Sequence, residues 1–247
     1  MQFSVVTLFP EMFDAIAKYG VVGRAIGNRI VTLQCINPRE FTTDAHRSVD
    51  DRPYGGGPGM VMKYEPMAAA IEQARETMPA QSRVICMSPQ GVPFNQAAAQ
   101  RLSGLPGVIL LAGRYEGIDE RLMERHVDEE ISLGDYVLSG GEIAAMAVID
   151  ATVRLLPGVL GDDESALQDS FSAGLLDFPH YTRPEMVDGR PVPEVLLSGD
   201  HARINRWRMK QAIGRSFRRR PDLLEKMELD VEQKQLLAEY LKENSDE

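Results

Sequence analysis

The sequence predicts an α/β fold: a mostly parallel sheet with helices on both faces, followed by a small helical domain. In residues 1–160, strand-like and helix-like segments alternate along the chain, as in sheets whose parallel strands are joined by crossover helices. The strand-like segments are almost continuously apolar, as in GVILLAG at 107–113, which is typical of strands buried on both faces. After Gly158 the composition becomes acidic and then proline-rich before two further helical segments.

The predicted strands each carry a short apolar run. They cover residues 3–9, 31–37, 82–88, 107–113 and 129–134. All are far shorter than the roughly 20 apolar residues that cross a bilayer, so we expect no membrane partner.

The predicted helices follow these strands in turn. In the first, Pro10 opens and Gly20 closes a short helix, and in the second Pro66 stands in the first turn, positions that suit these residue types. The predicted helices cover residues 10–20, 65–78, 95–104, 118–126 and 142–158, and later roughly 200–217 and 230–243.

These segments predict three regions in the 247-residue chain. Residues 1–160 form the α/β domain, and 161–174 form an acidic, small and polar linker, a composition typical of flexible connections. Residues 175–247 form the C-terminal helical domain. The length suits one large domain or two modest ones.

Composition indicates a cytoplasmic protein of ordinary globular type, with 43% hydrophobic and 26% charged residues. The first residues, MQFSVVTLFPEMF, lack the basic leader and long apolar core of a signal peptide. Cys35 and Cys86 have no partner at metal-ligand spacing, so we expect buried thiols in a reducing compartment.

The net charge of −10 argues against a protein that coats nucleic acid, but the charge is unevenly distributed. Residues 200–220 contain eight Arg or Lys and one acidic residue. A locally basic surface on an acidic protein favours selective binding of a polyanion.

Three glycine-containing loops follow predicted strands: SPQG (88–91), GRYEGID (113–119) and GDYVLSGGE (134–142). None matches the dinucleotide or P-loop pattern. Each alone is as well explained as an ordinary turn. Three of them at the carboxyl ends of successive strands favour one shared pocket, suited to a flat aromatic base.

A fourth loop, DDRPYGGGPGMVMKYEP at 50–66, is rich in glycine and proline. It is either a flexible surface loop or a shaped wall against a ligand or partner. Its prolines and the neighbouring Tyr54, Met60 and Met62 favour the wall.

Four segments together resemble the bacterial tRNA (guanine-37-N1)-methyltransferases of the SPOUT superfamily: DDRPYGGGPGMVMK, LAGRYEGIDER, SLGDYVLSGGE and PHYTRP (179–184). The resemblance spans essentially the whole chain, in order and with compatible spacing. Leu133 replaces the usual isoleucine, and Ile143–Ala144 the usual Leu–Pro.

The resemblance implies a trefoil knot in the sheet domain, which pattern alone does not predict because chains rarely thread their own loops. It implies S-adenosyl-L-methionine as the cofactor, held in a cleft formed by the three loops. The cofactor-binding residues that it implies are Ser88, Pro89, Gln90, Gly91, Gly113, Tyr115, Glu116, Gly117, Ser132, Leu133, Gly134, Asp135, Tyr136, Val137, Leu138, Gly140 and Gly141.

Methylation of guanine N1 needs a proton acceptor, and negative charge that grows on O6 needs a donor or cation. Carried over from the resemblance, Asp169 is the general base and Arg154 steadies the base and the guanine. Glu116 is a third candidate, contacting guanine or helping to hold Mg²⁺, which the family's activity requires. No carboxylate cluster in the sequence predicts a tight metal site.

The basic segment 200–220 then becomes the expected tRNA contact. The residues expected to bind phosphates are Arg203, Arg206, Arg208, Lys210 and Arg215. For Trp207 and Phe217 we favour packing over base stacking. The resemblance also implies a homodimer whose active site is shared between subunits, with tRNA carrying guanosine at position 37 as substrate.

Two other functions are compatible with the motifs. One is a SPOUT ribose 2′-O-methyltransferase. The other is a non-catalytic RNA-binding module with a vestigial cleft. The intact three-loop set, with Asp169 and Arg154 present, disfavours the second.

Overall fold

The computed structural model describes residues 1–161 and 169–244, which divide into two compact units, Met1–Asp163 and Glu164–Glu247. Of the predicted linker 161–174, residues 162–168 therefore lie outside the described residues. Among the described residues, no helix combines the length and apolarity needed to cross a bilayer.

The first unit contains a five-stranded sheet in the order β2-β1-β6-β5-β7, and every pair of neighbouring strands is parallel. This confirms the prediction of a mostly parallel sheet. The strands are β1 (Gln2–Val6), β2 (Thr32–Ile36), β5 (Arg83–Pro93), β6 (Gly107–Leu111) and β7 (Glu129–Ser132).

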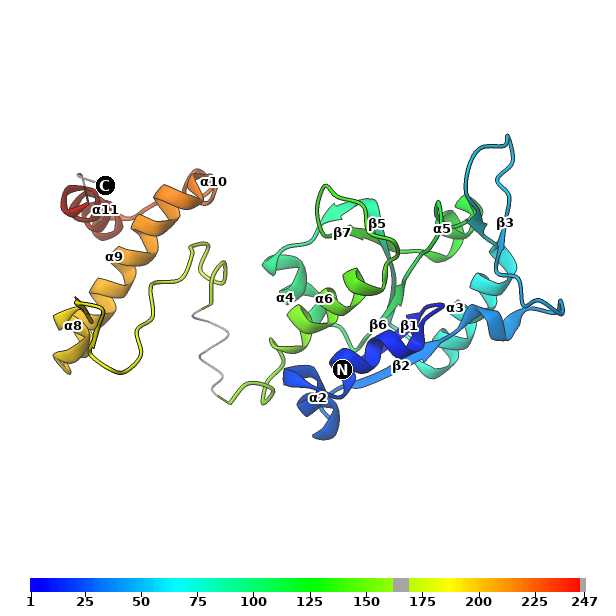
Figure 1. The fold of residues 1–247 in the computed structure, drawn as a ribbon, viewed down its shortest axis with the longest axis horizontal. Helices are drawn as coiled ribbons and strands as arrows, with labels where there is room; N and C mark the ends of the chain where they lie inside the picture. The colour runs from blue at the N-terminus through cyan, green and yellow to red at the C-terminus, as the bar shows by residue number, and fades with distance from the viewer. Residues whose placement is uncertain (162–168, 245–247) are drawn as a thin grey trace. The chain divides into compact units, whose positions relative to one another are not determined.

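Helices cover both faces of this sheet (Figure 1). Alternate residues of β6 point to opposite faces, so Val108 and Leu110 join one apolar cluster while Ile109 and Leu111 join the other. The first cluster is completed by α1 (Asp14–Ala17), α2 (Gly20–Gly27), α4 (Gln96–Ser103) and α6 (Glu142–Val153). The second is completed by α3 (Tyr64–Thr77) and α5 (Glu120–His126).

Two predicted helices have the wrong extent. The helix expected at 10–20 is a 3₁₀ turn, η1 (Pro10–Phe13), followed by α1, and Gly20, with a φ of 66°, begins α2 instead of ending a helix. The helix expected at 142–158 ends at Val153. Pro157 accounts for this end, because its ring would clash with the carbonyl four residues earlier in a continued helix.

Short elements in two loops were not predicted. They are η2 (Pro38–Phe41) and the two-residue strands β3 (Asp50–Asp51) and β4 (Val61–Met62), which pair antiparallel around the glycine-rich loop.

The second unit is built on two packed helices, α9 (His201–Arg219) and α11 (Val231–Glu243). Asp200 caps α9 by accepting from two backbone amides, and Asp230 and Gln233 form a capping box on α11. Ile213 and Leu236 are buried between the helices. The other elements are α8 (Glu194–Leu197), α10 (Pro221–Leu224), β8 (Met186–Val187) and β9 (Arg190–Pro191).

Both cysteines are free thiols: Cys86 is buried and Cys35 half-buried. Burial raises the pKa of Cys86 to about 12 and that of Cys35 to about 11. Neither thiol is activated for nucleophilic chemistry at neutral pH.

Candidate functional site

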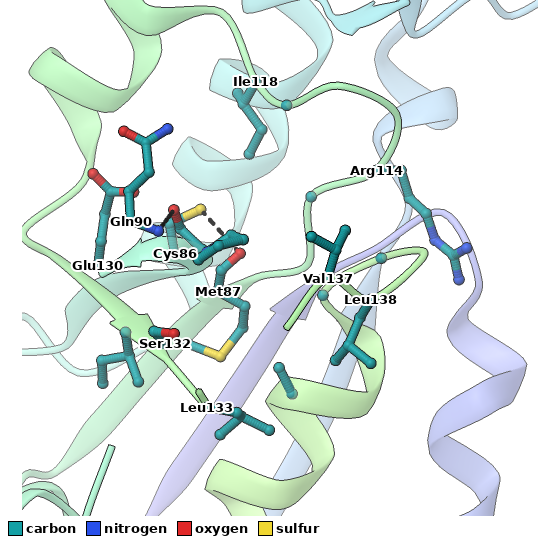
Figure 2. Close-up of a pocket in the computed structure, with 18 of the residues that line it drawn as sticks. Cys86, Met87, Gln90, Arg114, Ile118, Glu130, Ser132, Leu133, Val137 and Leu138 are labelled. Carbon is teal, nitrogen blue, oxygen red and sulfur yellow. Dashed lines mark hydrogen bonds between the residues drawn. The ribbon is translucent and has the colours of Figure 1, made fainter. Parts of the chain in front are cut away.

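A cavity of about 390 Å³ lies in the first unit at the carboxyl ends of β6, β5 and β7. These three parallel strands are neighbours in the sheet, so the loops that follow β6 and β7 meet the later part of β5 at one edge. The volume is within the range of small-molecule sites, roughly 300–1,000 Å³. Figure 2 shows side chains from the three segments gathered around it.

The first of these segments, residues 88–91, was predicted as a turn after a strand and is instead a bulge inside β5. Met87 and Val92 both pair with Ile131 of β7, so the four residues between them leave the ladder. Gln90 N donates to the Ser88 hydroxyl at 3.1 Å within the bulge. A bulge re-aims backbone and side chains, here into the cavity.

The structure brings nearly all the predicted cofactor-binding residues to the cavity wall. Only Gly91 and Asp135 of that set do not line it. The residues that do are Ser88, Pro89, Gln90, Gly113, Tyr115, Glu116, Gly117, Ser132, Leu133, Gly134, Tyr136, Val137, Leu138, Gly140 and Gly141.

The loops after β6 and β7 touch through their backbones. Gly141 N donates to Gly113 O at 2.9 Å. A Cβ on Gly141 would lie 2.8 Å from the Cα of Ala112 and 3.1 Å from Gly113 N, closer than side chains approach backbone. The absence of a side chain at Gly141 therefore allows the two walls to meet.

Several lining residues were not among the predicted cofactor-binding residues. They are Cys86, Met87, Arg114, Ile118, Glu120, Met123, Glu130, Ile131, Ser139 and Ala144. Arg114, Ile118 and Ser139 lie within the predicted loops 113–119 and 134–142, and most of the others are close to a predicted loop in the sequence.

The lining combines an apolar surface with an excess of carboxylates. Figure 2 shows Leu133 and Leu138 on one side and Gln90 beside Glu130 on the other. Glu116 and Glu120 add two further carboxylates, while Arg114 is the single basic residue among the described residues of the lining. This balance suits a ligand with an aromatic group and positive charge.

The glycine-rich loop is joined to the cavity by backbone hydrogen bonds. Glu116 N donates to Met60 O at 2.9 Å, and Met62 N donates to Gly117 O at 2.9 Å. Tyr54 at its tip is fully exposed. The loop is thus anchored next to the cavity at its base and open to solvent at its tip.

Of the three predicted catalytic residues, Glu116 lines the cavity, whereas Arg154, in the same unit, does not. Arg154 is the C-cap of α6, whereas it was expected within the helix. The cavity is at the other end of this helix, where Ala144 lines it, about 15 Å away at 1.5 Å per residue. Asp169 belongs to the second unit, where its carbonyl accepts from Ser172 N at 3.1 Å.

Two of the basic residues expected to bind tRNA phosphates are paired with α11. Arg206 forms two hydrogen bonds with Glu239, at 2.8 and 2.9 Å, and Lys210 binds Glu243 at 2.6 Å. The hydrogen bonds from Arg206 hold the pKa of Glu239 down at about 2.

The other three residues expected to bind tRNA phosphates differ in their exposure and contacts. Arg203 is exposed and Arg215 half-buried. The Arg208 guanidinium lies over the Phe178 ring at 4.7 Å.

The aromatic residues near this helix contact one another. Trp207 is half-buried beside Tyr181, with ring centroids 6.4 Å apart, whereas Phe217 is 43% exposed. His180 Nε2 lies 3.0 Å from the Asp177 carboxylate. These contacts account for His180 and Tyr181 of the PHYTRP segment as parts of a local cluster.

In the described part of the chain, no three His, Cys, Asp or Glu side chains gather as a metal site would require.

Residues 1–226 match the family described as tRNA (Guanine-1)-methyltransferase TrmD. Curated relatives named tRNA (guanine-N(1)-)-methyltransferase align along almost their whole length. The protein of Nitrosospira multiformis is 62% identical, covering 96% of each chain. That of Methylococcus capsulatus is 60% identical, covering 98% of this chain and 97% of the relative, and that of Pseudomonas syringae pv. tomato is 57% identical, covering 100% and 98%.

Proposed function

The chain belongs to the tRNA (guanine-1)-methyltransferase family, and from that premise we propose that it methylates N1 of the guanosine at position 37 of tRNA, using S-adenosyl-L-methionine. The observation that carries the proposal is the cavity built by the 88–91 bulge of β5 and the loops after β6 and β7. An α/β sheet binds small ligands at this edge.

The cavity fits the proposed cofactor in shape and charge. Its apolar side, with Leu133 and Leu138, suits an adenine ring, and glycine backbone at 113, 117 and 140–141 allows close approach. The carboxylates of Glu116, Glu120 and Glu130 favour a ligand with a sulfonium and an ammonium group. S-adenosylmethionine, when bound, supplies an electrophilic methyl whose leaving group is a neutral thioether.

Asp169 is proposed to take the N1 proton of guanine, leaving the N1 electron pair to form the new bond to the methyl carbon. Arg154 would stabilise the negative charge that develops on O6 and hold the Asp169 carboxylate in place. Glu116, which lines the cavity, is proposed to orient the guanine. Correct alignment of the reacting atoms supplies much of the remaining rate enhancement.

We propose that the active site forms between two copies of the chain. Arg154 is about 15 Å along α6 from Ala144, the nearest lining residue of that helix, too far for its side chain to reach a guanine there. A homodimer would supply Arg154 or Asp169 from the partner subunit. The trefoil knot belongs to the same proposal, as the threading that brings residues 113–118 and 134–141 together.

The second unit, with residues 175–247, is proposed to bind tRNA through α9, the helix that carries the basic residues 203–215. Divalent Mg²⁺ is proposed as an activator that acts through the RNA or the substrates, because the described residues form no cluster for it. The reaction would take place in the cytoplasm, where tRNA is processed.

The experiment is methylation of a tRNA transcript with labelled S-adenosylmethionine, followed by nuclease digestion and mass spectrometry. We expect 1-methylguanosine at position 37 and no transfer when this guanosine is replaced by adenosine. A methyl on ribose would indicate the 2′-O-methyltransferase. Cofactor binding by calorimetry without any transfer, or no binding at all, would instead support the non-catalytic module.

A further inference from the structure

Glu142, the first residue of α6, is a completely buried carboxylate that no step of the proposed reaction uses. The Thr7 hydroxyl donates to its Oε1 at 3.0 Å. Arg114 Nε lies 2.9 Å from its Oε2. Thr7 follows β1 and Arg114 follows β6, so one side chain joins three segments that are distant in the sequence.

A buried carboxylate is costly unless it is paired. The position of Glu142 in the first turn of α6 adds a favourable interaction with the helix dipole. The Arg114–Glu142 contact has ion-pair distance, yet Nε and Oε2 lack hydrogen-bond alignment with any described residue. The contact therefore depends on the two charges more than on hydrogen-bond geometry.

The guanidinium of Arg114 makes three further contacts around Glu142. It donates through Nη1 to Ser139 O at 3.1 Å, lies over the Phe9 ring at 4.5 Å and approaches Met12 Sδ at 3.7 Å. Figure 2 shows its side chain extending away from the other labelled lining residues. Arg114 thus starts on one wall of the cavity and is anchored to the other.

We propose that Arg114 and Glu142 are positioning residues for cofactor binding: their buried ion pair holds the 134–141 wall against the 113–118 wall. This rests on the proposed function, because the cofactor is S-adenosylmethionine. The pair contacts no reacting atom, so it acts on the shape of the cavity before the reaction begins. Loss of this ion pair weakens cofactor binding and leaves the reaction rate at saturating cofactor and tRNA unchanged.

Gly140 provides independent support, because the pair occupies the space beside its Cα. A Cβ at this position would overlap the side chain of Arg114 and approach Glu142 Oε2. Gly140→Ala should therefore displace the pair without changing any charge. A Cβ added to Gly27, at the end of α2, would meet no atom within 4 Å, so Gly27→Ala is the matched control.

The test measures S-adenosylmethionine affinity by calorimetry on the full-length protein, with thermal unfolding and steady-state kinetics of each variant. Glu142→Gln, Arg114→Met and Gly140→Ala should each weaken binding by about tenfold or more, the factor that corresponds to 1.4 kcal/mol. For Glu142→Gln, whose site lies outside the cavity lining, the rate at saturating cofactor and tRNA should stay within about twofold. Arg114→Lys, which keeps the charge, should recover part of the affinity.

Two further variants keep the test decisive if a single change unfolds the protein. The double variant Arg114→Met/Glu142→Leu removes both charges, a replacement that is often neutral for folding, and it should fold yet bind the cofactor weakly. Arg101→Met breaks the ion pair with Glu129, which lies outside the cavity lining, and should leave affinity unchanged.

Each outcome has a separate meaning. Wild-type protein that binds no S-adenosylmethionine would overturn the proposed function. If the wild type binds and a folded double variant binds equally well, the positioning role is overturned. Loss of rate at saturating substrates without loss of affinity would also overturn it, as would equal weakening by Arg101→Met.

Discussion

The two units of the chain use ion pairs in different ways. In the first, the Glu142 carboxylate is 1% exposed and its Arg114 partner 19%. In the second, the partners Arg206 and Glu239 are 43% and 33% exposed. Losing one partner of a buried pair costs about 3–5 kcal/mol, whereas an exposed pair contributes roughly 0.2–1 kcal/mol.

The difference shows what each set of charges can do. A buried pair cannot exchange partners without exposing a charge, so it suits a fixed cavity wall. An exposed arginine can replace a carboxylate partner by a phosphate at little cost. The buried pair therefore agrees with the fixed ligand cavity proposed for the first unit, and the exposed pairs agree with the tRNA contacts proposed for the second.

The largest expected effect is on catalysis. Asp169→Asn should lower kcat by roughly 10²–10⁴, the usual contribution of a general base, and Arg154→Ala should likewise leave the enzyme almost inactive. Both should leave cofactor affinity near wild type. The measurements are single-turnover methyl transfer and calorimetry.

Asp188→Asn is a matched control, because Asp188 is exposed in the β8–β9 turn at a φ of 49°, which asparagine tolerates. Normal turnover by folded Asp169→Asn would remove Asp169 as the base.

The next effect tests the fixed wall of the first unit. Gly141→Ala would place a methyl 2.8 Å from Ala112 Cα, so we expect a loss of about 1–3 kcal/mol in the free energy of unfolding. Cofactor affinity should fall as the two walls separate. Urea unfolding and calorimetry measure the two effects, and unchanged values for both would show that the walls are adjustable.

A smaller effect distinguishes the arginines of the second unit. Arg203→Met and Arg215→Met should weaken tRNA binding and each reduce the slope of log affinity against log salt by about 1. Arg206→Met should have less effect, because Arg206 must first leave Glu239. Filter binding at several salt concentrations would show this order, and equal losses for all three would contradict it.

Glu239→Gln tests whether the pairing of Arg206 with Glu239 limits tRNA binding. This change releases Arg206 and should strengthen tRNA binding. Glu225→Gln, at an exposed acid next to α10, makes the same change in net charge. If both variants strengthen binding equally, net charge and not the release of Arg206 is the cause.

The smallest effect concerns pH. Burial and the nearby Arg75 lower the pKa of His126 in the folded protein, so the unfolded chain takes up this proton more readily. The contribution to stability is complete above about pH 6.5, the unfolded value, and is lost as pH falls below it. His126→Gln should flatten the dependence of Tm on pH between 7 and 5, and an unchanged slope would contradict this.

Sequence patterns located most of the elements and most of the cavity lining, because both depend on local features. Alternating apolar and helical segments placed all five strands of the central sheet, and the three glycine-containing segments held most of the lining. The predictions were wrong where contacts between segments distant in the sequence determine the local structure. The 88–91 bulge exists because β7 pairs with β5 on both sides of it, and α2 contains three glycines, which are weak helix formers.

By itself, the sequence determined the α/β pattern, the order of the segments that line the cavity and the family to which the chain belongs. Only the tertiary structure decided that β6, β5 and β7 are neighbours, that Glu142 is buried between Thr7 and Arg114, and that Arg206 and Lys210 are paired with α11. Propensity and spacing act over a few residues. The partner of a buried or paired charge is instead set by which distant segments the fold brings into contact.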